Sequence, residues 1–207
     1  MALISNAKGR GEDETPSGYE RLFGNRQLGM LMSKVQSAII STGVELENIL
    51  ASKIKNTKGI SIQQINKSGR VFSGIKHGHD IIIDCVINKD GKTYLIEIKD
   101  GDTFDTKKIA GELESLELVK NFLIKKKISA NKIEIKFCSF NAESHEQIKR
   151  GAKGLLDDSM AMTGKEFCKL VNINFDEVIE ERKSQQEENL NYFTEELKKI
   201  PEIADKF

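Results

Sequence analysis

The segment DIIIDCVINKDGKTYLIEIK, from Asp80 to Lys99, gives the clearest secondary-structure signal in the chain. Two runs rich in β-branched residues, DIIIDCVI and KTYLIEIK, flank the four residues NKDG at 88–91. Such runs, separated by a short segment that ends in Asp-Gly, are typical of a β-hairpin. The sequence therefore predicts two antiparallel strands that turn near Lys89 and Asp90.

Four ionisable side chains are expected on one face of this hairpin. Side chains alternate between the two faces of a strand, so Asp80 and Asp84 share a face while the isoleucines beside them point to the other face. On the second strand Glu97 and Lys99 would lie beside the two aspartates. The other face, rich in isoleucine, is predicted to be core.

The negative charges of carboxylates that meet on such a patch must be balanced. Two of them about 4 Å apart repel by roughly 4 kcal/mol at an effective dielectric constant of 20, so a cation or a proton must be present. Magnesium prefers oxygen ligands and usually keeps several waters, and a neighbouring lysine can orient or deprotonate one of them toward a phosphate. The patch therefore has the composition of a metal-dependent hydrolytic site.

A second interpretation is an antiparallel sheet with one solvated face, on which Asp, Glu and Lys pair across strands. Ile82 and Leu95 would lie on the same face as the charged residues. These two side chains and the apolar flanks favour partial enclosure of the charges, and enclosed charged groups usually have a function.

The rest of the chain is predicted from periodicity. Apolar residues at helical spacing predict two helices between Leu28 and Ile54, with a break at Gly43. Residues 1–18 lack an apolar period and are expected to form a flexible lead-in, followed by a single domain over 19–207. The other expected elements are an edge strand at 60–65, a β-like piece at 71–72, a helix at 106–127, a strand at 132–140, and helices at 143–156, 164–171 and about 175–199.

Composition excludes several classes of protein. With 38% hydrophobic and 31% charged residues, the 207-residue chain has the profile of a soluble globular protein. No stretch approaches the roughly 20 apolar residues of a membrane span, and no signal peptide is expected. Cys85, Cys138 and Cys168 are widely spaced, which indicates neither a disulfide framework nor a zinc site and fits a reducing cytoplasm.

The charge is distributed unevenly although the net charge is zero. Residues 51–76 carry six bases and no acids, whereas residues 176–207 carry ten acids and five bases. A polyanionic partner and a solvated lysine-rich surface both explain the basic stretch.

The hairpin resembles a known family. Asp84, followed after twelve residues by Glu97-Ile98-Lys99 at the end of an apolar strand, is similar to the motif of the PD-(D/E)xK nuclease superfamily, which includes many type II restriction endonucleases and the archaeal Holliday junction resolvases. The segment from Asp100 to Leu116 is similar to the segment that comes after the lysine in some restriction enzymes. The resemblance covers about 43–140, and it implies an α/β (α+β) fold: an α-β-β-β-α-β core with a central mixed sheet flanked by helices, followed by a helical part over 143–207.

The resemblance also implies roles for individual residues. Asp84 and Glu97 would bind Mg²⁺, with Mn²⁺ as an alternative ion, and Lys99 would assist the attacking water. Glu47 or Glu45, on the preceding helix, would hold an outer-shell water.

The sequence departs from the family pattern at the first acid, which often follows a proline. Here the candidates are His79-Asp80 and Ile83-Asp84. Depending on the register of the hairpin, Glu97 lies opposite residue 82 or 84, so Asp84 is the first candidate ligand and Asp80 the second.

Candidate DNA contacts flank the hairpin. Lys107 and Lys108 begin the next helix, where the helix N-terminus adds partial positive charge for a phosphate. Lys76 and His77 precede the hairpin. A solvated helix start and an ordinary loop explain the same residues without DNA.

The resemblance implies a cytoplasmic, magnesium-dependent type II restriction endonuclease that cleaves double-stranded DNA at a short specific site. A palindromic site cut on both strands is most simply served by a homodimer with two-fold symmetry. The alternatives are a structure-selective repair or Holliday junction nuclease of the same superfamily, and a non-catalytic protein whose long C-terminal helix mediates assembly.

Overall fold

The computed structural model describes residues 2–9, 16–54, 60–62, 71–76, 78–101, 104–126 and 132–204. The chain divides into two compact units. One combines Met1–Leu46 with Asp176–Phe207, and the other is Glu47–Phe175. The predicted hairpin and every element of the sheets belong to the second unit.

The second unit is built on a mixed β-sheet. Its strands are β1 (Ile60–Ile62), β2 (Val71–Lys76), β3 (His79–Ile82), β4 (Cys85–Lys89), β5 (Lys92–Lys99), β6 (Lys132–Ser139) and β7 (Ala161–Thr163). Five of them form one sheet in the order β1-β4-β5-β6-β7, while β2 and β3 form a separate two-stranded sheet. β4 is antiparallel to β1 and β5, and β6 is parallel to β5 and β7. The predicted mixed sheet is confirmed.

The predicted hairpin is formed by β4 and β5. Lys89 pairs with Lys92, which leaves Asp90 and Gly91 as a two-residue turn with φ angles of 51° and 70°. Such a turn needs positive φ at both central residues, and Asp-Gly adopts that conformation at low cost. The turn thus lies about one residue later than predicted.

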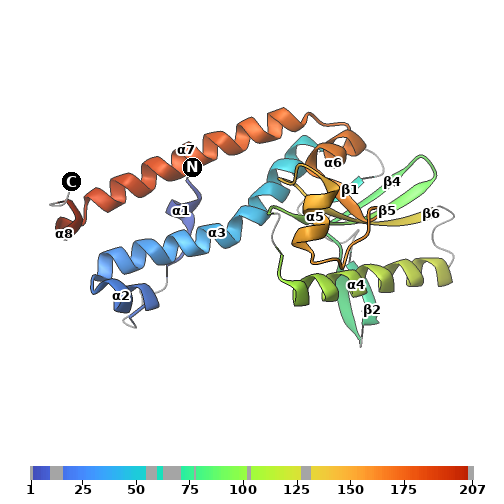
Figure 1. Ribbon diagram of the computed structural model, residues 1–207, viewed down its shortest axis with the longest axis horizontal. Coiled ribbons are helices and arrows are strands. Elements are labelled where there is room, and N and C mark those ends of the chain that lie inside the picture. The colour runs from blue at the N-terminus through green and yellow to red at the C-terminus, as the bar shows by residue number, and fades with distance from the viewer. Residues whose placement is uncertain are drawn as a thin grey trace. The chain divides into compact units, whose positions relative to one another are not determined.

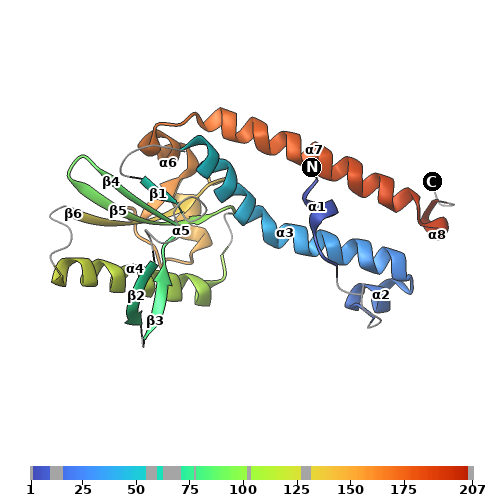
Figure 2. The same cartoon turned by 180° about the vertical axis from the view of Figure 1, so that it is seen from behind.

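The first run of the hairpin is not one strand. β3 ends at Ile82 and pairs with β2, with Val71 opposite Ile82, and the chain bends at Asp84 before β4 begins. Figure 2 shows β2 and β3 leaving the main sheet as a ribbon. The prediction of a continuous strand over 80–87 is therefore wrong, because pairing with β2 draws the first half of this β-branched run into a second sheet.

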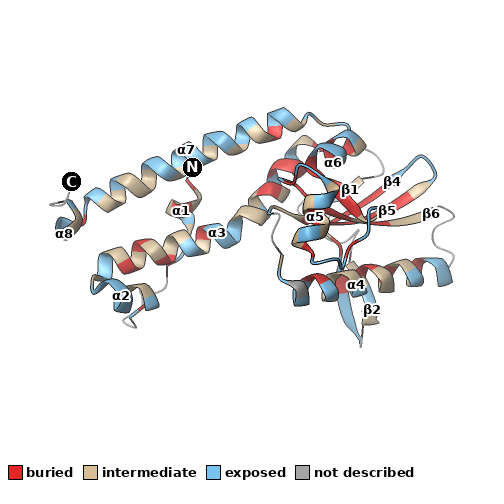
Figure 3. Ribbon diagram, in the orientation of Figure 1, coloured by how far each residue is buried: buried red, intermediate tan, exposed pale blue. Residues whose placement is uncertain are grey.

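Helices cover both faces of the main sheet. α4 (Thr106–Lys125) lies on one face, and α6 (Gly164–Val171) lies on the other with the C-terminal end of α3 (Arg26–Lys53), as Figures 1 and 2 show. The strands are consequently mostly buried (Figure 3). The face under α4 joins strand and helix residues in one apolar cluster: Ile81, Ile83, Val86, Leu95, Leu116, Val119, Leu123 and Ile135. A sheet with one solvated face is thus excluded, since Leu95 is fully buried.

The observed elements correct two further predictions and add one strand. α3 runs through Gly43 without a break, because one helical glycine costs only about 1 kcal/mol relative to alanine and Leu46, Ile49 and Leu50 are buried directly after it. α5 (His145–Gly151) is shorter than the predicted helix at 143–156. β7 was not predicted.

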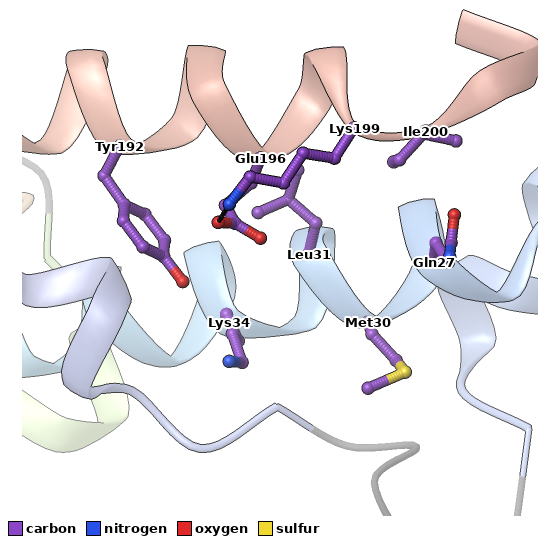
Figure 4. Close-up of a pocket in the computed structure, with 8 residues that line it drawn as sticks. All are labelled: Gln27, Met30, Leu31, Lys34, Tyr192, Glu196, Lys199 and Ile200. Atoms are coloured by element: carbon purple, nitrogen blue, oxygen red, sulfur yellow. Dashed lines mark hydrogen bonds and ion pairs between the residues drawn. The ribbon is translucent and has the colours of Figure 1, made fainter.

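The first unit is helical. Besides the first part of α3 it contains α1 (Leu3–Asn6), α2 (Gly18–Phe23), α7 (Phe175–Lys198) and α8 (Pro201–Ala204). α3 and α7 lie side by side, and Leu31, Lys34 and Tyr192 help to line a pocket of about 260 Å³ between them (Figure 4). Within the predicted lead-in, the backbone N–H of Ile4 donates to Asn189 Oδ1 at 3.1 Å. In the described ranges of the chain, no helix is long and apolar enough to cross a membrane.

Candidate active site

A cavity of about 540 Å³ opens beside the hairpin in the second unit. The described residues that line it come from three places: the β2–β3 ribbon, the bend before β4 with the end of β5, and one stripe of α4. They are Lys76, His79, Asp80, Ile81, Ile82, Ile83, Asp84, Glu97, Lys108, Gly111, Glu112 and Ser115. Five of the residues singled out in the sequence therefore line this cavity, whereas Lys99 does not belong to the described lining.

Asp84 is fixed in place by the backbone of β5. Its Oδ2 accepts a hydrogen bond of 2.9 Å from the N–H of Ile98. Because Cys85 pairs with Ile96, Asp84 is level with Glu97 across the hairpin. Of the two registers left open by the sequence, the structure has the one that brings Asp84 beside Glu97.

Glu97 is a buried carboxylate, 8% exposed. It points to the face of the sheet that α4 covers, the face that also holds Leu95. Burial, reinforced by the neighbouring Asp84 carboxylate, raises the pKa of Glu97 to about 8 even though Lys99 opposes the shift. The site thus favours either a proton or a cation at Glu97.

Lys99 joins the two sides of the site. Its Nζ donates to Glu97 Oε1 at 2.5 Å and to Glu112 Oε1 at 2.8 Å. Burial lowers the pKa of Lys99, but the carboxylates of Glu97 and Glu112 outweigh it and raise that pKa above its usual value. Lys99 is therefore held as an ammonium group between two carboxylates.

Glu112 is a member of the site that the sequence reasoning missed. It lies on α4, and its Oε2 is a buried atom for which no hydrogen-bond partner is found among the described residues. The available signal was helical spacing, since Lys108, Glu112 and Ser115 recur at four and three residues and share one face of the helix. Nothing in that spacing indicates which face meets Lys99.

The other predicted acids lie in different places. Asp80 lines the cavity from β3. Glu45 accepts a hydrogen bond of 2.7 Å from Gln185 Nε2 within the first unit. Neither Glu45 nor Glu47 is among the described residues that line the cavity.

Of the residues predicted to contact DNA, some line the cavity and others do not. Lys108 and Lys76 line the cavity, although Lys76 also forms an ion pair of 2.7 Å with Glu114. Lys107 is exposed at the start of α4, with its backbone N–H donating to the N-cap residue Asp105, and it does not belong to the described lining. His77 lies outside the described residues.

The donor set suits a hard cation. Asp84 and Glu97 offer carboxylate oxygens, and burial together with the neighbouring Asp84 carboxylate raises the pKa of Glu97, so a bound cation would favour its ionised form. Within the described parts of the chain, no three side chains of His, Cys, Asp or Glu form a ready metal cluster. Magnesium commonly binds through one or two carboxylates and completes its shell with waters, so this pair fits it.

Comparison with known proteins places the chain in a family. No family model matches it. A type II restriction enzyme, HhaII of Haemophilus parahaemolyticus, is 34% identical over 225 aligned positions, which cover 99% of this chain and 97% of the relative. Among solved structures, the small subunit of the heterodimeric restriction endonuclease R.BspD6I matches 76% of this chain and 90% of its own, with 15% identity and a TM-score of 0.34. On the strength of the full-length similarity to HhaII, the chain belongs to the type II restriction endonucleases, hydrolases of DNA phosphodiester bonds.

Proposed function

We propose that this restriction endonuclease cleaves double-stranded DNA at a short specific site in a Mg²⁺-dependent reaction centred on Asp84, Glu97 and Lys99. The observation that carries the proposal is the proximity of these three residues. Asp84, tied to the N–H of Ile98, and the buried Glu97 line one cavity, and Lys99 is paired with Glu97. A DNA-cleaving enzyme needs such a concentration of charge at the scissile phosphate.

The metal would be held by Asp84 and Glu97, with Asp80, which lines the same cavity, as the second candidate. Bound there, Mg²⁺ would supply Lewis-acid stabilisation of the charge that develops on the phosphate, and Mn²⁺ is expected to substitute. The protein's own part is to keep both carboxylates on one face of the hairpin. The backbone N–H of Ile98 donates to Asp84 Oδ2 and so helps to hold the Asp84 carboxylate in this position.

Lys99 is assigned to the attacking water. An ammonium paired with two carboxylates is a hydrogen-bond donor, so Lys99 would orient the water and offset negative charge at the phosphate. Lys108 and Lys76, which line the cavity, and also Lys107 and His77, are proposed to contact DNA phosphates. Glu45 and Glu47 are less well supported as holders of an outer-shell water, because they do not belong to the described lining.

The proposed assembly is a homodimer in the reducing cytoplasm. A two-fold dimer places one site on each strand of a palindromic duplex. Cys85, Cys138 and Cys168 are buried thiols, which suits a reducing compartment. Sedimentation at micromolar concentration tests the dimer, and a mass of one chain in the presence of cognate DNA would contradict it.

Digestion of DNA tests the proposed function. The purified protein is incubated with plasmid and genomic DNA in magnesium, in manganese and in chelator, beside a Lys99→Ala variant. Discrete metal-dependent fragments that disappear in the variant are expected. Fragments in chelator, or an unimpaired Lys99→Ala variant, would overturn the proposed chemistry.

A further inference from the structure

The environment of Lys99 is the feature that points beyond the proposed site. Its ammonium nitrogen is 2.5 Å from Glu97 Oε1 and 2.8 Å from Glu112 Oε1. Under the proposed function, Glu97 also serves as a metal ligand, so its oxygens are shared with a cation that repels the ammonium group. Glu112 is then the counter-ion that remains wholly with Lys99.

Glu112 is not an ordinary surface glutamate. Its side chain is 16% exposed, whereas that of Glu114 on the same helix is 61% exposed. Burying a carboxylate is costly unless it is paired, and the pair with Lys99 supplies this compensation. The neighbouring Leu116 is buried in the apolar cluster under the sheet, which fixes this part of α4 against β5.

We infer that Glu112 is a positioning residue for Lys99 and holds its ammonium group beside Glu97 while Glu97 binds the metal. The inference rests on the proposed function. It assigns Glu112 an effect through Lys99, whose ammonium group donates to Glu112 Oε1, and no direct bond to the metal. Glu112 Oε2, a buried acceptor at the same cavity, has capacity for one further donor such as a water.

The charges of the site agree with this division of roles. Glu97 and its charged neighbours Asp84, Glu112 and Lys99 carry three carboxylates and one ammonium group, so a divalent cation would bring these four groups to neutrality when all are ionised. Removal of the charge of Glu112 would leave Lys99 dependent on Glu97 alone, in competition with the metal.

Kinetics of Glu112→Gln provide the first arm of the test. The amide keeps the shape and one acceptor but loses the charge. Single-turnover cleavage at saturating Mg²⁺ is expected to slow by roughly 10- to 100-fold, the usual effect of losing a residue that supports a metal site from outside. The Mg²⁺ concentration for half-maximal rate and the affinity for cognate DNA in chelator are expected to stay at wild-type values.

Glu117→Gln is the matched control. Glu117 lies on the same helix and pairs with Lys120 at 3.2 Å, and it does not belong to the described lining of the cavity. The same substitution there should leave the cleavage rate unchanged. Equal effects of the two variants would overturn the inference, since they would reflect the helix rather than Lys99.

Nuclear magnetic resonance of lysine side chains provides a readout that does not depend on activity. The Cε–H and Nζ signals of Lys99, assigned by their loss in Lys99→Arg, are recorded in metal-free protein. Glu112→Gln should shift them and Glu117→Gln should not. Unchanged Lys99 signals in Glu112→Gln would overturn the inference even if cleavage were slow.

The remaining outcomes are also decisive. A higher half-saturating Mg²⁺ concentration with a restored maximal rate would make Glu112 a metal ligand and overturn the positioning role. If Glu112→Gln does not fold, Glu112→Asp replaces it, because aspartate keeps the charge but holds it one methylene farther from Lys99. A slowed cleavage rate in Glu112→Asp would support the positioning role, and a wild-type rate would contradict it. Failure of the wild-type protein to cleave DNA would refute the proposed function, while the Lys99 signals would still report on the pair.

Discussion

At the scale of single residues, Lys99 is held between Glu97 of its own strand and Glu112 of α4. Alternation along β5 is enough to place Glu97 and Lys99 on one face, and Asp84 joins them because it lies level with Glu97 just before β4. Glu112 could not be predicted in the same way. Its contact with Lys99 is made by the packing of α4 against the sheet, which no local pattern encodes.

Glu97 makes the stability of the metal-free protein depend on pH. Its pKa is about 8 in the folded chain and near its usual 4.5 when unfolded, so the folded state holds a proton that the unfolded chain releases. The stability from this group is fully present below pH 4.5 and is lost as the pH rises through about 8. Urea unfolding in chelator should therefore show wild type losing more stability than Glu97→Gln between pH 6 and pH 9. Parallel losses in the two proteins would contradict the pKa assigned to Glu97.

Two adjacent lysines are expected to differ in their effect on DNA binding. Lys108 lines the cavity and Lys107 does not, although both begin α4. Lys108→Ala should weaken binding to all DNA sequences alike and lower the slope of log affinity against log salt by about one. Lys107→Ala serves as the matched control with a smaller effect. Fluorescence anisotropy over a series of salt concentrations measures both slopes, and a reversed order of the two would place the DNA elsewhere.

At the scale of elements, local sequence signals predict the strands and the turn, but they do not predict which strands pair. The β4–β5 hairpin is predicted because Asp-Gly supplies the positive φ angles of its turn. The same stretch also produced the main error: the isoleucines at 81–83 have the same strand propensity whether they continue β4 or pair with β2. β2 (Val71–Lys76) pairs with the first part of this run, and that pairing separates it from β4.

The burial of the β5 face that α4 covers can be tested by shortening the side chain of Leu95. Leu95 is fully buried under α4, while Ile82, which the sequence placed on the same face, is 49% exposed in β3. Leu95→Ala is expected to cost about 2–5 kcal/mol of unfolding free energy, and Ile82→Ala, as the control, should cost far less. Chemical denaturation measures both. Equal small losses would restore the interpretation of a solvated face.

At the scale of the whole molecule, the two units show why sequence patterns do not predict which segments belong together. The first unit joins Met1–Leu46 with Asp176–Phe207, segments from opposite ends of the chain. The amphipathic pattern of a helix predicts that it packs against something and does not identify its partner. The order of strands in the sheet is non-local in the same sense, and β7, only three residues long, carries too short a pattern to be recognised.

Whether Asp84 and Glu97 form the metal site can be measured by a Mn²⁺ titration that follows the paramagnetic resonance signal of the free ion. Wild type, Asp84→Asn, Glu97→Gln and Asp80→Asn are compared without DNA, so that binding is separated from cleavage. We expect Asp84→Asn and Glu97→Gln to lose most of the Mn²⁺ binding and Asp80→Asn to keep it. Wild-type binding by Asp84→Asn, or loss of binding in Asp80→Asn alone, would refute this metal site and move the metal to Asp80.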